Sequence, residues 1–334
     1  MMNPGKINGN VLKRSVLRQV KKNKINQSLL NGAGIGEDCA VFSSFGDKYT
    51  LSCMQEGEIL TLSGTGFGSV SHLILKGINN LAACGGRVKN ISMTLLLPED
   101  AEEETLKTIV EQASVFAEEK GISFIGGQTR VLNSISIPIA VLNFFGVADR
   151  IYDAAAVKPG MDIVLSKYIG LEGTAYLART EREELLLRYP AYLVNEAESF
   201  EGYYSIESEA AIAGMSDVVL MHDVSEGGIF AGIWEIAEKA DVGLKIDMKR
   251  LPLRQETVEV CERLSKNPYE LMSGGCLIMI ANDGEALADA IRQKGITANV
   301  VGKITDDNAR IFVNDEEVRY LDRPHVDALF ADAE

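Results

Sequence analysis

The sequence lacks the features that would place it outside the class of ordinary globular proteins. It has no apolar run that approaches the length of a membrane span, and no apolar signal-peptide core near its start. Basic residues are in the minority, since 33 Lys and Arg face 48 Asp and Glu for a net charge of −15. A net negative charge disfavours non-specific binding to nucleic acid or to an anionic membrane. We therefore expect a cytoplasmic protein that binds neither nucleic acid nor membrane.

Cysteine is also scarce, with five residues in the chain. The number is odd and no two cysteines have the CxxC spacing that is typical of zinc or redox motifs. We expect reduced, buried thiols that act as small hydrophobic side chains rather than disulfides or zinc ligands. The five residues are Cys39, Cys53, Cys84, Cys261 and Cys276.

The length of the chain predicts two domains. At 334 residues it exceeds what one hydrophobic core usually supports. Its 46% apolar and 24% charged residues are typical of a globular protein. A charged connector over residues 149–158 ends at Pro159-Gly160, and a new apolar segment follows. We place the boundary near residue 155, which gives domains at 1–155 and 156–334.

Apolar periodicity predicts alternating strands and helices, which indicates the α/β class. In the first half we expect helices over 11–20, 70–81 and 99–120, and strands over 49–54, 90–97, 123–125 and 135–147. In the second half we expect strands over 162–166, 218–221, 244–248, 276–281 and 298–304, helices after residues 228, 253 and 284, and a hairpin over 311–320. Glycine-rich segments stand at several strand-to-helix joints.

The stretch from Asn31 to Ala40 combines backbone freedom with negative charge. Gly34 and Gly36 allow the main chain to approach a ligand closely, and Glu37 and Asp38 add hard oxygen donors beside them. Such a turn suits phosphates bridged by a divalent cation, although the spacing fits neither a P-loop nor a dinucleotide fingerprint. A glycine-rich surface loop before a strand remains the alternative.

Three further segments have the same character. Gly66 and Gly68 open a long apolar-periodic segment, where they serve either an anion at a helix N-terminus or close packing. Gly-Gly-Gln-Thr at 126–129 follows a short predicted strand, and His-Asp-Val-Ser-Glu-Gly-Gly at 222–228 joins a strand to a helix. The acids in these segments are either ligands or solvated loop residues.

Taken together, segments 34–40, 66–86, 126–129 and 222–228 resemble the AIR synthetase (PurM-like) superfamily, with the HypE-like, AIR-synthase-related group as the most similar. The resemblance rests on Gly36-Glu-Asp-Cys-Ala, Asn79-Asn-Leu-Ala, the 222–228 motif and Ser273-Gly-Gly, in the same order along nearly the whole chain. It implies a two-domain α/β fold whose N-terminal sheets form a barrel across a homodimer. It also implies bound Mg²⁺ and ATP, and transfer of the γ-phosphoryl group to a carbonyl or amide oxygen of an acceptor that the sequence does not identify.

The resemblance also implies roles for individual residues. Asp38 and Asp223 are the expected catalytic residues, and together with Glu37 they are the expected metal ligands. Residues expected to contact the nucleotide are Gly34, Gly36, Gly66, Gly68, Asn80, Gly126, Gly127, Gln128, Thr129, Ser225, Glu226, Gly227 and Gly228.

The sequence departs from its relatives in two ways. Asn80 and Gln128 stand where relatives often carry an acidic or other metal-binding residue, so we expect weakened Mg²⁺ binding. HypE proteins end in a cysteine that accepts a carbamoyl group, whereas the residue at position 334 is Glu334. We therefore do not expect synthesis of the hydrogenase cyanide ligand.

These features leave several functions open. The first is an ATP-dependent phosphoryl-transfer enzyme with a small-molecule or protein acceptor. The second is a dimeric relative that has lost turnover and binds a nucleotide or a partner protein. The third is a role like that of a hydrogenase maturation factor without the terminal cysteine. Thiamine-monophosphate kinase activity is disfavoured, because no Asp-rich strand end follows Met54.

Overall fold

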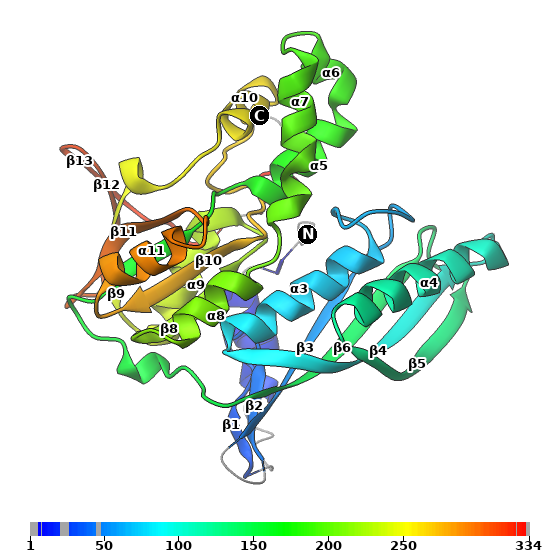
Figure 1. Cartoon of the computed structure of the whole chain (residues 1–334), viewed down its shortest axis with the longest axis horizontal. Helices are drawn as coiled ribbons and strands as arrows, with labels where there is room; N and C mark the ends of the chain where they lie inside the picture. The colour runs from blue at the N-terminus through cyan, green and yellow to red at the C-terminus, as the bar shows by residue number, and fades with distance from the viewer. Residues whose placement is uncertain (1–5, 8, 21–26, 45–47, 325, 332–334) are drawn as a thin grey trace. The chain divides into compact units, whose positions relative to one another are not determined.

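A computed structural model describes residues 6–7, 9–20, 27–44, 48–324 and 326–331, and it divides the chain into two compact units (Figure 1). The N-terminal unit comprises residues 28–32 and 38–151, and the C-terminal unit comprises residues 1–27, 33–37 and 152–334. Each unit contains one mixed sheet and several helices, so the α/β fold class is confirmed. The glycine turn over 33–37 belongs to the C-terminal unit, although its neighbours in sequence belong to the other.

The N-terminal unit is built on a six-stranded sheet with the order β1-β2-β3-β6-β4-β5. Its strands are β1 (Leu29–Asn31), β2 (Ala40–Ser43), β3 (Tyr49–Glu58), β4 (Gly86–Pro98), β5 (Ser123–Leu132) and β6 (Ile139–Ala148). Neighbouring strands are antiparallel except for β4 and β5, which are parallel. Helices α3 (Val70–Ala83) and α4 (Glu103–Glu119) lie on one face of this sheet (Figure 1).

The core of the N-terminal unit lies between these two helices and the sheet. Leu51, Leu142 and Phe144 are fully buried there. Gly77 of α3 faces the ring of Phe144, where a Cβ atom would lie 2.2 Å from the nearest ring carbon. The missing side chain therefore lets α3 pack directly on β6, since an added methyl group would overfill the core.

The C-terminal unit is built on a seven-stranded sheet with the order β13-β12-β9-β11-β7-β10-β8. Its strands are β7 (Asp162–Ser166), β8 (Val218–Val224), β9 (Gly243–Asp247), β10 (Cys276–Ala281), β11 (Ala298–Thr305), β12 (Arg310–Asn314) and β13 (Glu317–Tyr320). Every residue of β10 is buried, which agrees with its unbroken apolar sequence and its place between two other strands. The predicted terminal hairpin is present as β12 and β13.

The α-helices of the C-terminal unit are α1 (Gly9–Val11), α2 (Arg18–Val20), α5 (Leu171–Thr180), α6 (Arg182–Leu186), α7 (Ala191–Glu198), α8 (Glu207–Gly214), α9 (Gly228–Ala240), α10 (Gln255–Arg263) and α11 (Gly284–Arg292). Some helices of this unit, α8, α9 and α11, contact the second sheet. Others, α5, α6, α7 and α10, contact one another and form a separate group. The unit also has a π-helix, η1 (Leu12–Leu17), and three 3-10 helices among its described residues, η2 (Ala154–Ala156), η3 (Ser199–Tyr203) and η4 (Met248–Arg250). The predicted helix over 11–20 is present as α1, η1 and α2, with a π-helical middle section.

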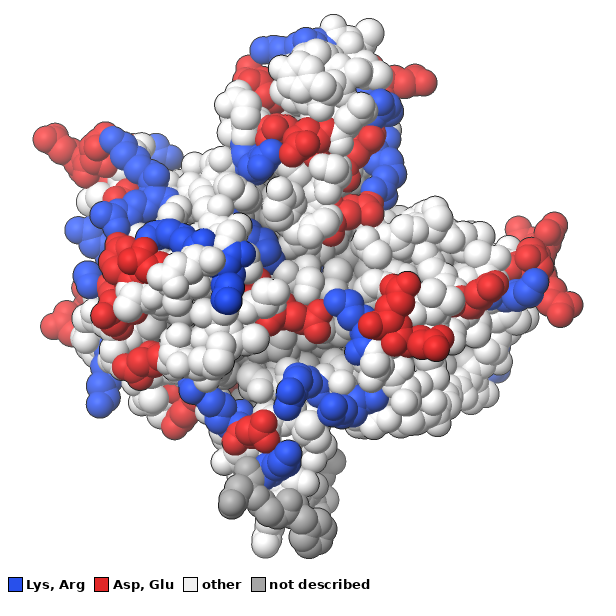
Figure 2. Space-filling view, in the orientation of Figure 1, with Lys and Arg blue, Asp and Glu red and all other residues white. Residues whose placement is uncertain are grey.

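The charged side chains and the helix lengths of the described residues can be inspected directly. Acidic and basic side chains are mixed on the face drawn in Figure 2. Among the residues that the structure describes, no helix combines the length and apolar character needed to cross a membrane.

Candidate functional site

The glycine turn over residues 33–37 packs against the side of α9. Gly36 has a φ of 71°, and a Cβ atom on it would lie 2.7 Å from the carbonyl oxygen of Glu235. A side chain at this position is therefore excluded by both backbone conformation and packing. Glu37 forms an ion pair with Lys239 of α9, with 2.8 Å between Lys239 Nζ and a carboxylate oxygen of Glu37. Both side chains are largely buried, so this predicted metal ligand already has a cationic partner.

A second glycine turn begins helix α9. Gly227 and Gly228 both have positive φ angles, 84° and 64°. A Cβ atom on Gly228 would lie 2.5 Å from the carbonyl oxygen of Tyr269. The carbonyl oxygen of Ser225 accepts hydrogen bonds from the N–H groups of Gly228 (3.2 Å) and Ser273 (3.1 Å). The segment over 269–273 therefore fixes this turn, and Gly228 is required for packing whether or not it contacts a ligand.

A carboxyl group of the protein itself lies at the N-terminus of α9. The carboxylate of Asp327 accepts hydrogen bonds from the N–H groups of Gly227 (2.6 Å) and Leu329 (2.8 Å). Asp327 is 1% exposed. Unpaired N–H groups and the helix dipole make a helix N-terminus favourable for negative charge. The N–H of Gly227, in the turn that the sequence predicts as a phosphate contact, is thus engaged by the protein's own carboxyl group.

Burial shifts the acid–base behaviour of this carboxyl group. Loss of solvation raises the pKa of Asp327 to about 7, with the nearby acids Glu172 and Glu226 adding to the rise. The hydrogen bonds from Gly227 and Leu329 oppose the shift, because they favour the ionised form. The packing of residues 326–331 on this unit is consequently coupled to pH.

Replacing Asp327 by asparagine should make the stability of the protein less dependent on pH. The folded-state pKa is raised, so the folded protein retains a proton that the unfolded chain loses as pH rises from about 4 to about 7. The wild-type free energy of unfolding should therefore fall across this window, by at most about 4 kcal/mol from this group, and stay level above it. Urea unfolding of wild type and Asp327→Asn at pH 5 and pH 7.5 measures the difference.

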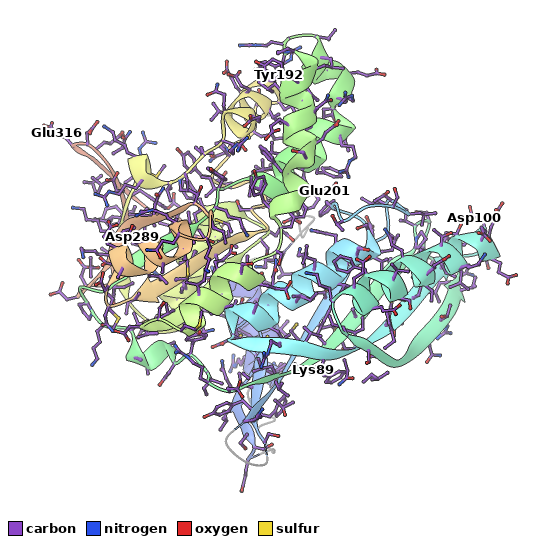
Figure 3. The ribbon with its side chains drawn as sticks, in the orientation of Figure 1. Lys89, Asp100, Tyr192, Glu201, Asp289 and Glu316 are labelled. Atoms are coloured by element: carbon purple, nitrogen blue, oxygen red, sulfur yellow. The ribbon has the colours of Figure 1, made fainter. Side chains whose placement is uncertain are left out.

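The control for this comparison is Glu316→Gln. It removes an exposed acid at the turn between β12 and β13 (Figure 3). Its pH dependence should match that of the wild type. An Asp327→Asn variant with the wild-type pH dependence would show that this carboxyl group does not carry the coupling.

A polar cluster of His222, Glu235 and the half-exposed Lys6 lies at the same helix. His222 is 4% exposed, and its Nε2 atom lies 3.0 Å from a carboxylate oxygen of Glu235. Lys6 Nζ lies 3.0 Å from the other oxygen of Glu235. Burial alone would raise the pKa of Glu235, but Lys6 and His222 outweigh it and lower the pKa to about 2. Glu235 is therefore ionised at neutral pH and holds His222 in place.

The predicted 222–228 turn is shorter in the structure than in the sequence analysis. His222 and Asp223 lie within β8, because this strand pairs with β10 up to Val224. The prediction that the strand ends at residue 221 is therefore wrong. The turn itself consists of Ser225, Glu226 and Gly227, and the backbone N–H of Lys6 donates to the Glu226 carboxylate.

A cavity of about 550 Å³ opens beside Gly227. Phe230 and Tyr269 form a stacked pair in its wall, with ring centroids 5.3 Å apart and an interplanar angle of 8°. Phe312 adds a third ring, and the wall carries charges of both signs, including Arg319 paired with Glu317 over 2.7 Å. An aromatic wall with a few charged groups is typical of small-molecule sites.

In the N-terminal unit, the glycine loop before α3 is confirmed as a helix entry. Gly68 has a φ of 83°, and its carbonyl oxygen accepts a 2.7 Å hydrogen bond from the N–H of Leu60. Ser69 caps the helix, since its hydroxyl accepts from the N–H of His72 at 3.1 Å. The carbonyl of Gly66 accepts from the Ser69 N–H. These contacts explain why a glycine occupies position 68 without reference to a ligand.

The sequence predicts that Gly126–Thr129 follows a strand end, and this prediction is wrong. The segment lies inside β5, where Gly126 to Thr129 pair in parallel with residues 92–95 of β4. A Cβ atom on Gly127 would lie 1.9 Å from the carbonyl oxygen of Met93, so close strand pairing requires this glycine. The side chain of Gln128 is exposed on this edge strand.

Asn80 occupies the last turn of α3, and its carbonyl oxygen accepts the thiol hydrogen of Cys39 over 3.3 Å. Gln128 lies on the exposed edge strand β5, which contacts α4. The two amides therefore belong to different elements of the N-terminal unit.

The structure brings some predicted residues together and adds others that the sequence analysis missed. In the C-terminal unit, Ser225, Glu226, Gly227 and Gly228 form one turn. Gly36 and Glu37 pack on the helix that follows it, and Gly34 lies against the Glu37 side chain. The missed residues are Lys6, Glu172, Glu235, Lys239 and Asp327. Asp327 contacts Gly227 from 100 residues away, so no local pattern of the sequence indicates this pair.

Two mixed sheets with helices and glycine turns at strand-to-helix joints define the class as an α/β protein. The family models for AIR synthase related proteins match residues 36–148 with the N-terminal domain and residues 158–314 with the C-terminal domain. The chain therefore belongs to the AIR synthase-related (PurM-like) superfamily and is HypE-like.

Individual relatives agree with this assignment. The chain is 26% identical over 285 residues to carbamoyl dehydratase HypE of Rhizobium leguminosarum bv. viciae, covering 82% of this chain and 78% of that protein. A solved HypE–HypF complex contains a chain with a TM-score of 0.72 at 20% identity, over 93% of this chain and 100% of that chain. A HypE solved in complex with ATP has a TM-score of 0.71 at 17% identity, over 99% of this chain and 98% of that chain.

Proposed function

We propose that the protein binds ATP with Mg²⁺ and transfers the γ-phosphoryl group to a carbonyl or amide oxygen of an acceptor. Such transfer depends mainly on positioning and on neutralising phosphate charge, so it needs N–H groups and metal ligands more than a nucleophile on the protein. The similarity to a HypE that binds ATP supports the nucleotide.

The observation that carries the proposal is the occupied N-terminus of α9. The N–H of Gly227 donates there to the Asp327 carboxyl group (2.6 Å), so the turn presents a backbone donor that an acidic oxygen accepts. Both glycine turns of this unit are fixed by packing, which provides the rigid backbone that phosphate recognition requires.

The proposal assigns Mg²⁺ to Asp38 and Asp223, with Glu37 as a further ligand once it leaves Lys239. The ion pair between Glu37 and Lys239 opposes metal binding, because a metal must displace a cation that already neutralises this carboxylate. Together with the amides Asn80 and Gln128, it supports weak Mg²⁺ binding. When bound, the metal would neutralise charge on the phosphates.

Calorimetry with ATP and with a non-hydrolysable analogue, each with and without Mg²⁺, tests the proposal directly. Saturable binding that strengthens with Mg²⁺ is the expected result. Absence of binding to either nucleotide in both conditions would contradict the assignment.

A second function deserves a separate test because two predicted ligand-facing groups are already engaged, Glu37 by Lys239 and Gly227 by Asp327. In this alternative the protein binds nucleotide but has lost turnover and acts through a partner. An ATPase assay at a saturating ATP concentration separates the two functions. Release of phosphate would support phosphoryl transfer, and its absence despite bound ATP would support binding without turnover.

We also propose that the N-terminal unit pairs with a second copy of itself. Helices cover one face of its sheet, and several large apolar side chains are exposed elsewhere on it, including Met54 (58%), Ile125 (58%), Val131 (58%) and Phe145 (38%). Strand β5 is also an edge of the sheet, so its outer backbone groups are free to pair. Exposed apolar side chains and an unpaired edge favour burial in a homodimer.

The Ile125→Lys variant should shift the protein from dimer to monomer. Placing a charge in an apolar interface costs several times more than the loss of the contact alone, so we expect dimer dissociation at micromolar concentration. Light scattering measures the mass of wild type and variant. Met215→Lys, which changes an 84% exposed residue of the C-terminal unit, is the matched control and should remain dimeric. A monomeric wild type would contradict the proposed dimer.

A further inference from the structure

Three of the five cysteines gather in one place in the N-terminal unit. Cys39 immediately precedes β2, Cys53 lies in β3, and Cys84 is the residue that ends α3. All five thiols are free in the structure, and the other two, Cys261 and Cys276, are buried in the C-terminal unit. The three thiols of the N-terminal unit pack on the same hydrophobic cluster.

Strand pairing places Cys39 beside Cys53. Ala40 pairs with Ser52 and Val41 with Leu51 in the antiparallel β2–β3 ladder, so the next position opposes Cys39 to Cys53. Val41 and Leu51 are buried, and alternation along each strand puts Cys39 and Cys53 on that same buried side. Cβ atoms of directly opposed residues lie about 4.5–5.5 Å apart, which is within a small movement of the geometry of a disulfide.

The end of α3 places Cys84 beside Cys39. The carbonyl oxygen of Asn80 accepts from both the Cys39 thiol (3.3 Å) and the Cys84 N–H (3.3 Å). The Cys53 thiol points to the same helix, with its sulfur 3.8 Å from the carbonyl oxygen of Gly77. Cys39 therefore stands between the other two thiols.

The three thiols differ in their access to solvent. Cys39 is 4% exposed, whereas Cys53 and Cys84 are only partly buried. Burial raises the pKa of the Cys39 thiol well above its usual value, and its contacts with the thiols of Cys53 and Cys84 add to the rise. An oxidant therefore reaches Cys53 or Cys84 first, and Cys39 is positioned to react second.

We propose that these cysteines form a reversible modification site, in which oxidation by a hydroperoxide joins Cys39 to Cys53 or to Cys84 in an intramolecular disulfide. The sulfur of the accessible thiol attacks the peroxide, the O–O bond breaks, and a sulfenic acid and one water form. The Cys39 sulfur then attacks the sulfenic sulfur, an S–S bond forms, and a second water leaves. The two thiols lose two electrons and two protons, which convert hydrogen peroxide into two waters.

The test uses the reduced full-length protein and hydrogen peroxide. The thiol count after denaturation should fall from five to three, and dithiothreitol should restore it, because one disulfide consumes two thiols. Tryptic mapping without reduction identifies the pair, since Lys48 separates Cys39 from Cys53 and Lys76 separates Cys53 from Cys84. A cross-linked peptide that contains Cys39 is the expected result.

Variants separate this site from general oxidation. Cys39→Ala should abolish the intramolecular disulfide, while Cys53→Ala and Cys84→Ala should each retain a link through the remaining neighbour. Cys261→Ala is the matched control and should behave as the wild type, because Cys261 is buried in the other unit. Five thiols that persist in peroxide, a disulfide that forms without Cys39, or links only between separate molecules would overturn the proposal.

Discussion

The Asp223→Asn variant should lose the Mg²⁺-dependent part of ATP binding while keeping the folded structure. Asparagine has the size of aspartate and retains one carbonyl oxygen, but it removes the negative charge that attracts the metal. Asp223 is partly buried in β8, where the surroundings screen charge less than bulk water does. We expect affinity for Mg-ATP to fall about tenfold or more, which corresponds to at least about 1.4 kcal/mol.

Calorimetry on wild type and Asp223→Asn, with and without Mg²⁺, measures this loss. Affinity for ATP without the metal should be nearly the same in both proteins. Glu316→Gln is the matched control, because it removes one negative charge at the exposed turn between β12 and β13 (Figure 3). Equal loss of affinity in the two variants would indicate a general effect of net charge, and an unchanged Asp223→Asn would remove this residue from the metal site.

The Gly228→Ala variant should destabilise the C-terminal unit rather than affect binding alone. Even a Cβ atom at this position would lie 2.5 Å from the carbonyl oxygen of Tyr269, and the φ of 64° is itself strained for alanine. We expect a loss of about 3 kcal/mol and a melting temperature lower by roughly 6–12 °C.

Gly202→Ala is the matched control for this variant. A Cβ atom on Gly202 meets no atom within 4 Å, so its melting temperature should stay close to that of the wild type. Thermal unfolding followed by circular dichroism compares the three proteins. A Gly228→Ala protein as stable as Gly202→Ala would show that the Tyr269 segment moves away at little cost, and would return Gly228 to a role in ligand contact.

The sequence by itself determined the fold class and the order of most elements. The strands over 162–166 and 276–281 appear in the structure with the predicted bounds, because their apolar runs are short and end at clear turn residues. The long helix α4 follows its apolar period and its acidic first turn. The local pattern is enough to predict such elements, because the spacing of their apolar residues shows which face is buried.

Strand ends were predicted less well, for a different reason. Gly126 and Gly127 interrupt the apolar pattern, yet they continue β5 because the neighbouring β4 supplies hydrogen-bond partners. His222 and Asp223 read as turn residues, yet they continue β8 because β10 pairs with them. Glycine and polar residues have weak intrinsic preferences for strands, so the pairing strand decides their conformation.

Only the tertiary structure decided which partners surround the candidate site. Lys239 lies 202 positions after Glu37, and Asp327 lies 100 positions after Gly227, yet each pair is in direct contact. The same is true of Cys39, which meets Cys53 through strand register and Cys84 through the end of a helix. Residue type predicts that a buried carboxylate or thiol will have a partner, but the partner is chosen by how remote segments pack, and no local pattern of the sequence contains that information.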